Sequence, residues 1–160
     1  KGHTRIACIM NRTEGSGSMR YAGYQAALCG AGIREEDGWA RWYEYESFQE
    51  FLEQERLVED CLSKVTAVFC FNDEMALGIM GILEKRGVRV PEDVSVIGYD
   101  DSYMCMFGAK KLTSVRQEPL KLGERAAQNL LGLIKNPNGD ADAFFEPEVV
   151  ERETVRDLNG

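Results

Sequence analysis

The sequence predicts an α/β protein built on a doubly wound, mostly parallel sheet. The first observation is a strand–helix–strand pattern over residues 66–102. A unit of this kind, about thirty residues long, places its two strands parallel in one sheet. The second observation is that short apolar runs alternate with stretches of helical spacing along the rest of the chain, in the order βαβαβαβ. The 160 residues are enough to form one domain with a full core.

The unit at residues 66–102 has clear boundaries. Thr66 to Phe71 is a short apolar run rich in residues that favour strands, and Val94 to Tyr99 is a second one. Gly87 predicts where the intervening helix ends. Within that helix, apolar residues recur at helical spacing, at Met75, Ala76, Ile79, Met80, Ile82 and Leu83.

The remaining elements follow in order along the chain. We expect further strands at residues 5–10, 41–45, 112–115 and 144–150. We expect helices after the polar loop 11–17 as far as Gly30 or Gly32, from Ser47 to Leu62, and from Pro119 to Lys135. Glu50 lies three residues after Ser47, so a capping box is expected to start the second of these helices.

Composition excludes several classes of protein. The net charge of −8 argues against a nucleic-acid-binding face. No apolar run approaches the roughly 20 residues that a membrane span needs. The five cysteines form no CxxC pair and His3 is the only histidine, so we expect no metal, no cofactor and a reduced, cytoplasmic protein. The chain begins without Met, which we interpret as the start of an excised piece.

Polar residues end both strands of the central unit. Asn72 follows the first strand and Asp100 follows the second. Ligands of open α/β sheets bind outside the carboxyl ends of the strands. A carboxamide beside a carboxylate suits a polyol, whose hydroxyls both donate and accept hydrogen bonds. The alternative is local, with Asn72 capping the next helix and Asp100 capping a turn.

Arg20 and Tyr45 are further candidates at the edge of the sheet that the carboxyl ends of the strands form. Arg20 opens the first helix, where a guanidinium can reach ligand oxygens; the alternative is a solvated surface arginine. Trp42, Tyr43 and Tyr45 cluster at the second strand, and we expect at least two of them to pack under the helices. Tyr45, nearest the carboxyl end of that strand, is the one expected to stack on a sugar ring.

Two other patterns bear on enzyme activity. Residues 15–18 lack the glycine spacing and the lysine of a phosphate-binding loop, so we interpret them as a loop and helix cap. Asp73, Asp100 and Asp101 have the oxygen ligands that Mg²⁺ prefers. No nucleophile or base accompanies them, so we assign no catalytic residue and keep an α/β enzyme as the second alternative.

An apolar surface is expected around Leu77, Met104 and Phe107. Leu77 lies off the stripe that Met75 and Ile79 form, so this region has more apolar side chains than one core needs. An exposed apolar patch is typical of an interface. The alternative is that residues 103–107 fold over Leu77 within one chain.

Three blocks of sequence resemble the effector-binding core of LacI/GalR-type transcription regulators. They are FNDEMALG at 71–78, VPEDVSVIGYDD at 90–101, and LTSVRQ with LGERAA at 112–127. The resemblance implies a periplasmic-binding-protein-like fold of type I. It also implies that Arg20, Asn72 and Asp100 contact a small-molecule effector and that the Leu77 region forms a homodimer. GYDDS followed by LTSV is similar to arabinose-responsive repressors with a GntR-type DNA-binding domain, which implies a sugar such as a pentose.

The same resemblance implies a division of the chain. Members of the family cross between two lobes three times. Residues 1–111 and 144–155 match the second lobe, and residues 112–135 match a crossover segment that completes the first. The first lobe's own strands are absent from this sequence. We therefore expect the helix from Pro119 to Lys135 to leave its family position and to pack on another copy of the chain, or to be mobile.

The sequence is therefore interpreted as the sugar-sensing C-terminal lobe of a transcription repressor. Ligand binding would shift the arrangement of the two lobes and so the DNA affinity of the parent protein. DNA would be bound only by a domain outside this chain. The first alternative is a sugar-binding protein of an uptake system, which shares the fold, although five cysteines in an odd set argue against export.

Overall fold

A computed structural model describes the chain except for residues 13–14, 55–56, 58–60, 140–141, 143 and 160. Within the described residues, six strands form one sheet in the order β2-β1-β3-β4-β5-β6. The first five strands are parallel and β6 runs antiparallel to β5. This confirms the predicted doubly wound, mostly parallel sheet. The strands are β1 Ile6–Asn11, β2 Ala40–Tyr43, β3 Ala67–Cys70, β4 Ser95–Asp100, β5 Thr113–Arg116 and β6 Glu148–Val150.

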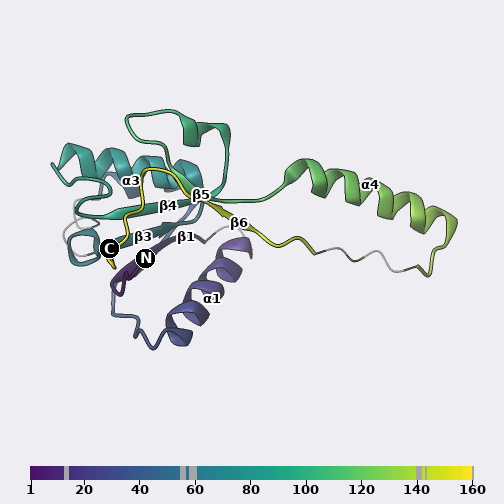
Figure 1. The fold of residues 1–160 in the computed structure, drawn as a ribbon, viewed down its shortest axis with the longest axis horizontal. Coiled ribbons are helices and arrows are strands. Elements are labelled where there is room, and N and C mark those ends of the chain that lie inside the picture. The colour runs from purple at the N-terminus through teal and green to yellow at the C-terminus, as the bar shows by residue number, and fades with distance from the viewer. Residues whose placement is uncertain (13–14, 55–56, 58–60, 140–141, 143, 160) are drawn as a thin grey trace.

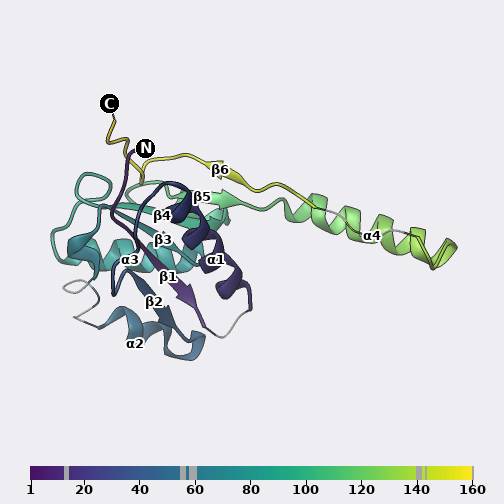
Figure 2. The same ribbon diagram turned by 90° about the horizontal axis from the view of Figure 1, so that it is seen from below.

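Helices cover both faces of the sheet (Figures 1 and 2). The helix α1, Gly15–Gly30, lies on one face, and α3, Asp73–Lys85, lies on the other together with the short α2, Phe48–Leu52. The buried side of α1 is made by Tyr24 and Leu28. The buried side of α3 is made by Met75, Ala76, Ile79 and Leu83. Each large side chain buried in this way stabilises the fold by about 1.5–3 kcal/mol.

The ends of α3 agree with the sequence signals. Asn72 is the N-cap, and its Oδ1 accepts a hydrogen bond of 2.9 Å from the Met75 backbone N–H. Asp73 and Glu74 lie in the first turn, where the helix dipole favours negative charge. Gly87 adopts a φ of 72° just after the helix, a backbone conformation that glycine reaches without strain.

The prediction of a helix from Ser47 to Leu62 is wrong. The helix α2 ends at Leu52, and Leu62 begins a separate 3₁₀ turn, Leu62–Lys64. The capping box is also absent, because the Ser47 hydroxyl donates to the Glu44 carbonyl at 3.1 Å instead of accepting from the helix. That bond holds the 3₁₀ turn Tyr45–Ser47 which precedes α2. Val58, an expected core residue of this helix, lies outside the described residues.

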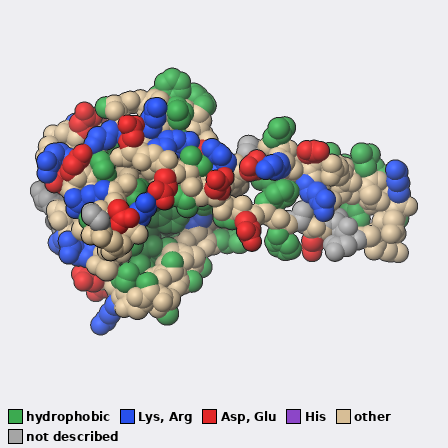
Figure 3. All heavy atoms as spheres, in the orientation of Figure 1, with side chains coloured by type: hydrophobic (Ala, Val, Ile, Leu, Met, Phe, Trp, Pro, Cys, Tyr) green, Lys and Arg blue, Asp and Glu red, His purple; other side chains and the backbone are tan. Residues whose placement is uncertain are grey.

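The helix α4, Pro119–Lys135, projects from the body of the molecule (Figure 1). The chain leaves along β5 and returns along β6, so that a narrow neck joins α4 to the body (Figure 3). Apolar side chains of α4 are exposed, among them Leu120 at 83% and Ile134 at 69%. The expectation that this helix has no sheet of its own to cover therefore agrees with the structure. Packing on another copy of the chain stays a prediction.

The two chain ends lie side by side in both ribbon views (Figures 1 and 2). The Leu158 backbone N–H donates to the Lys1 carbonyl at 2.9 Å. The His3 ring bridges the ends, with Nδ1 3.0 Å from Thr66 Oγ1 and Nε2 3.2 Å from the Arg156 carbonyl. Among the described helices, none combines the length and the hydropathy that a membrane span requires.

Candidate ligand-binding site

The candidate site lies at the carboxyl ends of β3 and β4. These strands are neighbours, with Phe69 opposite Ile97 in the parallel ladder. Asn72 lies three residues after Phe69, and Asp100 lies three residues after Ile97. The structure thus places the carboxamide and the carboxylate at one edge of adjacent strands, as the sequence predicted.

Arg20 reaches the same edge from the second turn of α1, which begins at Gly15, so the prediction that Arg20 opens this helix is wrong. Its guanidinium lies over the Tyr99 ring at 3.8 Å and over the Phe71 ring at 4.4 Å. Its Nη1 donates a hydrogen bond to the Phe71 carbonyl, and its Nη2 lies 3.5 Å from Asp100 Oδ1. Cation–π contacts with two rings and an ion pair fix the guanidinium. The Arg20 side chain is only 14% exposed, so the alternative of a solvated surface arginine is wrong.

Asp100 is the more accessible partner of this pair. Its side chain is 48% exposed, and its backbone has a φ of 102°. Such a conformation is costly for a residue with a side chain and is held only where the surroundings enforce it. The edge therefore combines a fixed cation, two aromatic rings and a carboxylate that faces solvent.

Asn72 acts as a helix cap, which was the local alternative for this residue. The cap engages Oδ1 and does not involve the two N–H donors of Nδ2. A ligand oxygen at the edge can accept from those donors while the cap stays in place. The structural role and a binding role are therefore compatible at this residue.

The aromatic cluster at β2 divides as expected. Tyr43 is buried and packs on Phe48 and Phe51, and Trp42 makes a T-shaped contact with the Tyr21 ring at 5.3 Å between centroids. Tyr45 follows β2 and is 56% exposed. Because β1 separates β2 from β3, Tyr45 stands at the outer end of the edge and is not brought against Arg20.

Asp73 and Asp101 are hydrogen-bonding groups next to this edge of the sheet. Asp73 is 2% exposed, and its carboxylate accepts from Ser114 Oγ at 2.5 Å and from the Ser102 backbone N–H at 2.7 Å. Asp101 pairs with Arg116 and with a second arginine described below. Within the described part of the chain, no group of three His, Cys, Asp or Glu side chains that could hold a metal ion is found.

Sequence reasoning missed the residues that hold this edge together. Phe71 and Tyr99 both contact the Arg20 guanidinium, and the available signal was an aromatic residue directly before Asn72 and before Asp100. Ser114 had no such signal, since it is 41 residues from Asp73 in the chain.

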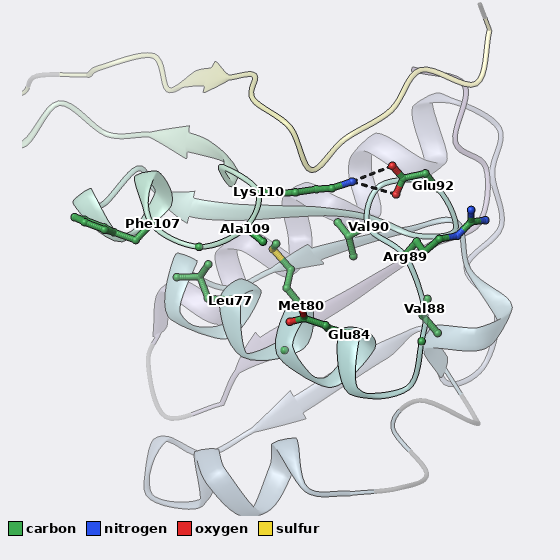
Figure 4. Close-up of a pocket in the computed structure, with 13 residues that line it drawn as sticks. Leu77, Met80, Glu84, Val88, Arg89, Val90, Glu92, Phe107, Ala109 and Lys110 are labelled. Carbon is green, nitrogen blue, oxygen red and sulfur yellow. Dashed lines mark hydrogen bonds and ion pairs between the residues drawn. The ribbon is translucent and has the colours of Figure 1, made fainter.

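A second surface lies between α3 and residues 107–110 (Figure 4). It is a groove of about 610 Å³, lined by Leu77 and Met80 of α3 and by Phe107. Phe107 is 64% exposed and makes a T-shaped contact with the Tyr103 ring at 5.9 Å between centroids, whereas Leu77 is half-buried and packs against the core. Met104, the third expected interface residue, is half-buried in the 3₁₀ turn Tyr103–Met106.

The fold is that of a periplasmic-binding-protein-like domain. The family model of the periplasmic binding protein-like domain matches residues 1–155. The chain belongs to this family.

Known relatives of this chain are transcription regulators. It is 37% identical over 161 residues to the HTH-type transcriptional repressor PurR of Vibrio atlanticus (strain LGP32), covering 99% of this chain and 48% of that protein. The transcriptional regulator CelR in complex with cellobiose has a TM-score of 0.82 and 31% identity, over 96% of this chain and 47% of that one. The lac repressor dimer bound to operator and the anti-inducer ONPF has a TM-score of 0.82 and 28% identity, over 96% and 53%. This chain spans about half the length of these relatives.

Proposed function

We propose that this chain is the C-terminal, effector-binding lobe of a cytoplasmic LacI/GalR-type transcription repressor. The observation that carries the proposal is the convergence of Arg20, Asn72 and Asp100 on one edge of the sheet. The relatives, which are repressors, support it. DNA would be bound through a domain outside this chain, in keeping with the net charge of −8.

The chemistry of the edge favours a sugar. Asp100 accepts hydrogen bonds from hydroxyls, Asn72 donates from Nδ2, and Arg20 supplies a fixed positive charge to ligand oxygens. Tyr45 is the proposed stacking partner at the outer end. The cellobiose bound by CelR supports a sugar in general. A pentose such as arabinose and a GntR-type DNA-binding domain remain finer predictions.

The mechanism would be differential binding by two lobes. We assign residues 1–111 and 144–155 to the second lobe and residues 112–135 to a crossover that completes the first. The ligand would bridge the lobes and favour one arrangement, which changes DNA affinity only as far as the ligand binds the two arrangements unequally.

The exposed face of α4 supports this assignment. An apolar helix face left open beyond the neck suits a crossover segment that a first lobe would cover.

The groove at Leu77 and Phe107 is the proposed homodimer surface. Its apolar lining and the exposed Phe107 ring suit a protein interface. The dimeric lac repressor among the relatives supports pairing in this class of protein.

The two alternatives make different demands. A binding protein of an uptake system would be exported, and no disulfide joins the five cysteines of this chain. An α/β enzyme would need a catalytic group at the edge, whereas the carboxylates there are engaged in ion pairs and hydrogen bonds. We propose that the protein is not an enzyme.

A thermal-shift screen of pentoses, hexoses and disaccharides on the full-length protein tests the proposal. A ligand at 100 times its dissociation constant stabilises the folded state by about 2.7 kcal/mol, which raises the melting temperature by several degrees. An Asp100→Asn variant is expected to lose that shift. A screen in which no sugar raises the melting temperature would contradict a sugar effector.

A further inference from the structure

Two consecutive aspartates at the end of β4 face different parts of the molecule. Asp100 lies beside Arg20 at the proposed ligand edge, and its side chain is 48% exposed. Asp101 turns inward, with its side chain only 6% exposed. Both residues have positive φ, 102° and 51°, so the backbone of the turn that they form is tightly constrained.

Asp101 binds both the outgoing and the returning segment of the chain at the base of the neck. Its Oδ2 accepts from Arg116 Nε at 2.7 Å, and its Oδ1 accepts from Arg152 Nη2 at 2.5 Å. Arg116 is the last residue of β5, on the way out to α4, and Arg152 lies two residues after β6, on the way back. One buried carboxylate therefore holds the outgoing and the returning segments together.

The two arginines make further contacts around this carboxylate. Arg152 Nη1 donates to the Leu112 carbonyl at 2.6 Å, and the Arg152 backbone N–H donates to Thr113 Oγ1 at 2.9 Å. Arg116 also lies 3.7 Å from Glu148 of β6. Burial raises the pKa of Asp101, but the hydrogen bonds from Arg152 and Arg116 outweigh burial and leave the pKa below its usual value.

The backbone of the turn is fixed from the other side. The Asp101 N–H donates to Ser114 Oγ at 3.0 Å, and Ser114 in turn donates to Asp73, whose other oxygen accepts from the Ser102 N–H. A shift of Asp100 therefore strains bonds to β5 and to Arg152 just after β6, since Asp101 cannot follow without moving its partners. Surface ion pairs contribute little, but buried pairs with several hydrogen bonds resist displacement.

We propose that Asp101 is a positioning residue that couples the ligand edge at Asp100 to the β5–β6 pair, the neck through which the chain reaches α4. The meaning of this coupling for an effector rests on the proposed function. The coupling itself is a property of this chain and can be measured without any ligand. A failed ligand screen would therefore count against the proposed function and not against the coupling.

The test is a double-mutant cycle read by amide hydrogen exchange on the 160-residue chain. Arg20→Gln removes the ion pair of Asp100. Asp101→Asn weakens the bonds from Asp101 to Arg116 and Arg152. We expect Asp101→Asn to speed exchange of the β5–β6 amides by about tenfold or more, and that of β1 and β3 much less. We expect Arg20→Gln to speed β5–β6 exchange about threefold or more, but only when Asp101 is present.

Asp93→Asn is the matched control, because it breaks an exposed aspartate–arginine pair, with Arg89 at 2.8 Å, away from the neck. It should leave β5–β6 exchange unchanged. Arg116→Gln, at a half-exposed position, replaces Asp101→Asn in the cycle if that variant does not fold. An effect of Arg20→Gln that is equal with and without the Asp101 pair would overturn the coupling. So would an unchanged β5–β6 ladder in both Asp101→Asn and Arg116→Gln.

Discussion

Gly98 is the residue whose substitution tests the packing of the edge most severely. A Cβ at this position in β4 would lie 2.3 Å from Asp73 Oδ1, 3.0 Å from Leu112 Cδ2 and 3.2 Å from Asp73 Cα. The carboxylate must move, yet it is held by Ser114 Oγ and the Ser102 N–H. Gly98→Ala should therefore strain the core and also break hydrogen bonds that support the turn carrying Asp100.

The size of the effect follows from these contacts. Overpacking a core costs about 1–3 kcal/mol, and a hydrogen bond to a charged group contributes about 1.5–3 kcal/mol. The reduced freedom of the unfolded chain returns about 0.4–1 kcal/mol. We expect a net loss of about 3 kcal/mol in the free energy of unfolding, measured by urea denaturation.

Gly23→Ala in α1 is the matched control, because nothing lies within 4 Å of its Cβ position. This exposed helical site should instead gain about 1 kcal/mol from helix propensity. A Gly98→Ala variant within about 1 kcal/mol of wild type would show that Asp73 is not confined as described.

Three further predictions concern other parts of the molecule. Burial lowers the pKa of His3, so protonation of His3 opposes folding, and the free energy of unfolding should fall as the pH drops below about 6.5. His3→Gln should therefore reduce the difference in unfolding free energy between pH 7 and pH 5. An unchanged difference would be inconsistent with the bridge that His3 makes between the chain ends. Asn72→Ala should cost about 1 kcal/mol by losing the cap, whereas Asn72→Asp keeps the cap and removes the amide donors; the idea of a dual role fails if both variants bind ligand like wild type. Leu77→Asp places a charge in the proposed interface and should weaken dimerisation, measured by sedimentation velocity. The control Leu158→Asp, on the C-terminal tail, should leave dimerisation unchanged. Equal dimerisation of both variants would rule out the groove as the interface.

The sequence predicted the centre of the fold better than its periphery. The start and end of α3 depend on local chemistry, namely the Asn72 cap and the Gly87 turn, and local chemistry can be read from a single sequence. The edge was predictable for the same reason, because the residue after each buried strand must emerge at the carboxyl side of a parallel sheet.

The errors have physical causes too. The end of α2 at Leu52 was missed because apolar residues continue beyond it, and Leu57 and Leu62 are buried without extending that helix. Asp101 was considered only as a metal ligand, because its partners Arg116 and Arg152 lie 15 and 51 residues away and no periodic pattern marks such a pair.

Binding at this edge is tested most directly by a calorimetric titration of the full-length protein with the sugar that gives the largest thermal shift. We predict saturable binding by the wild type and by Asp93→Asn, and at least about tenfold weaker binding by Asp100→Asn, because one charge-assisted hydrogen bond is worth about 1.5–3 kcal/mol. The 160-residue lobe alone should bind the same sugar poorly, since it supplies only half of the proposed site. Binding that is unaffected by Asp100→Asn would contradict the placement of the ligand at this edge.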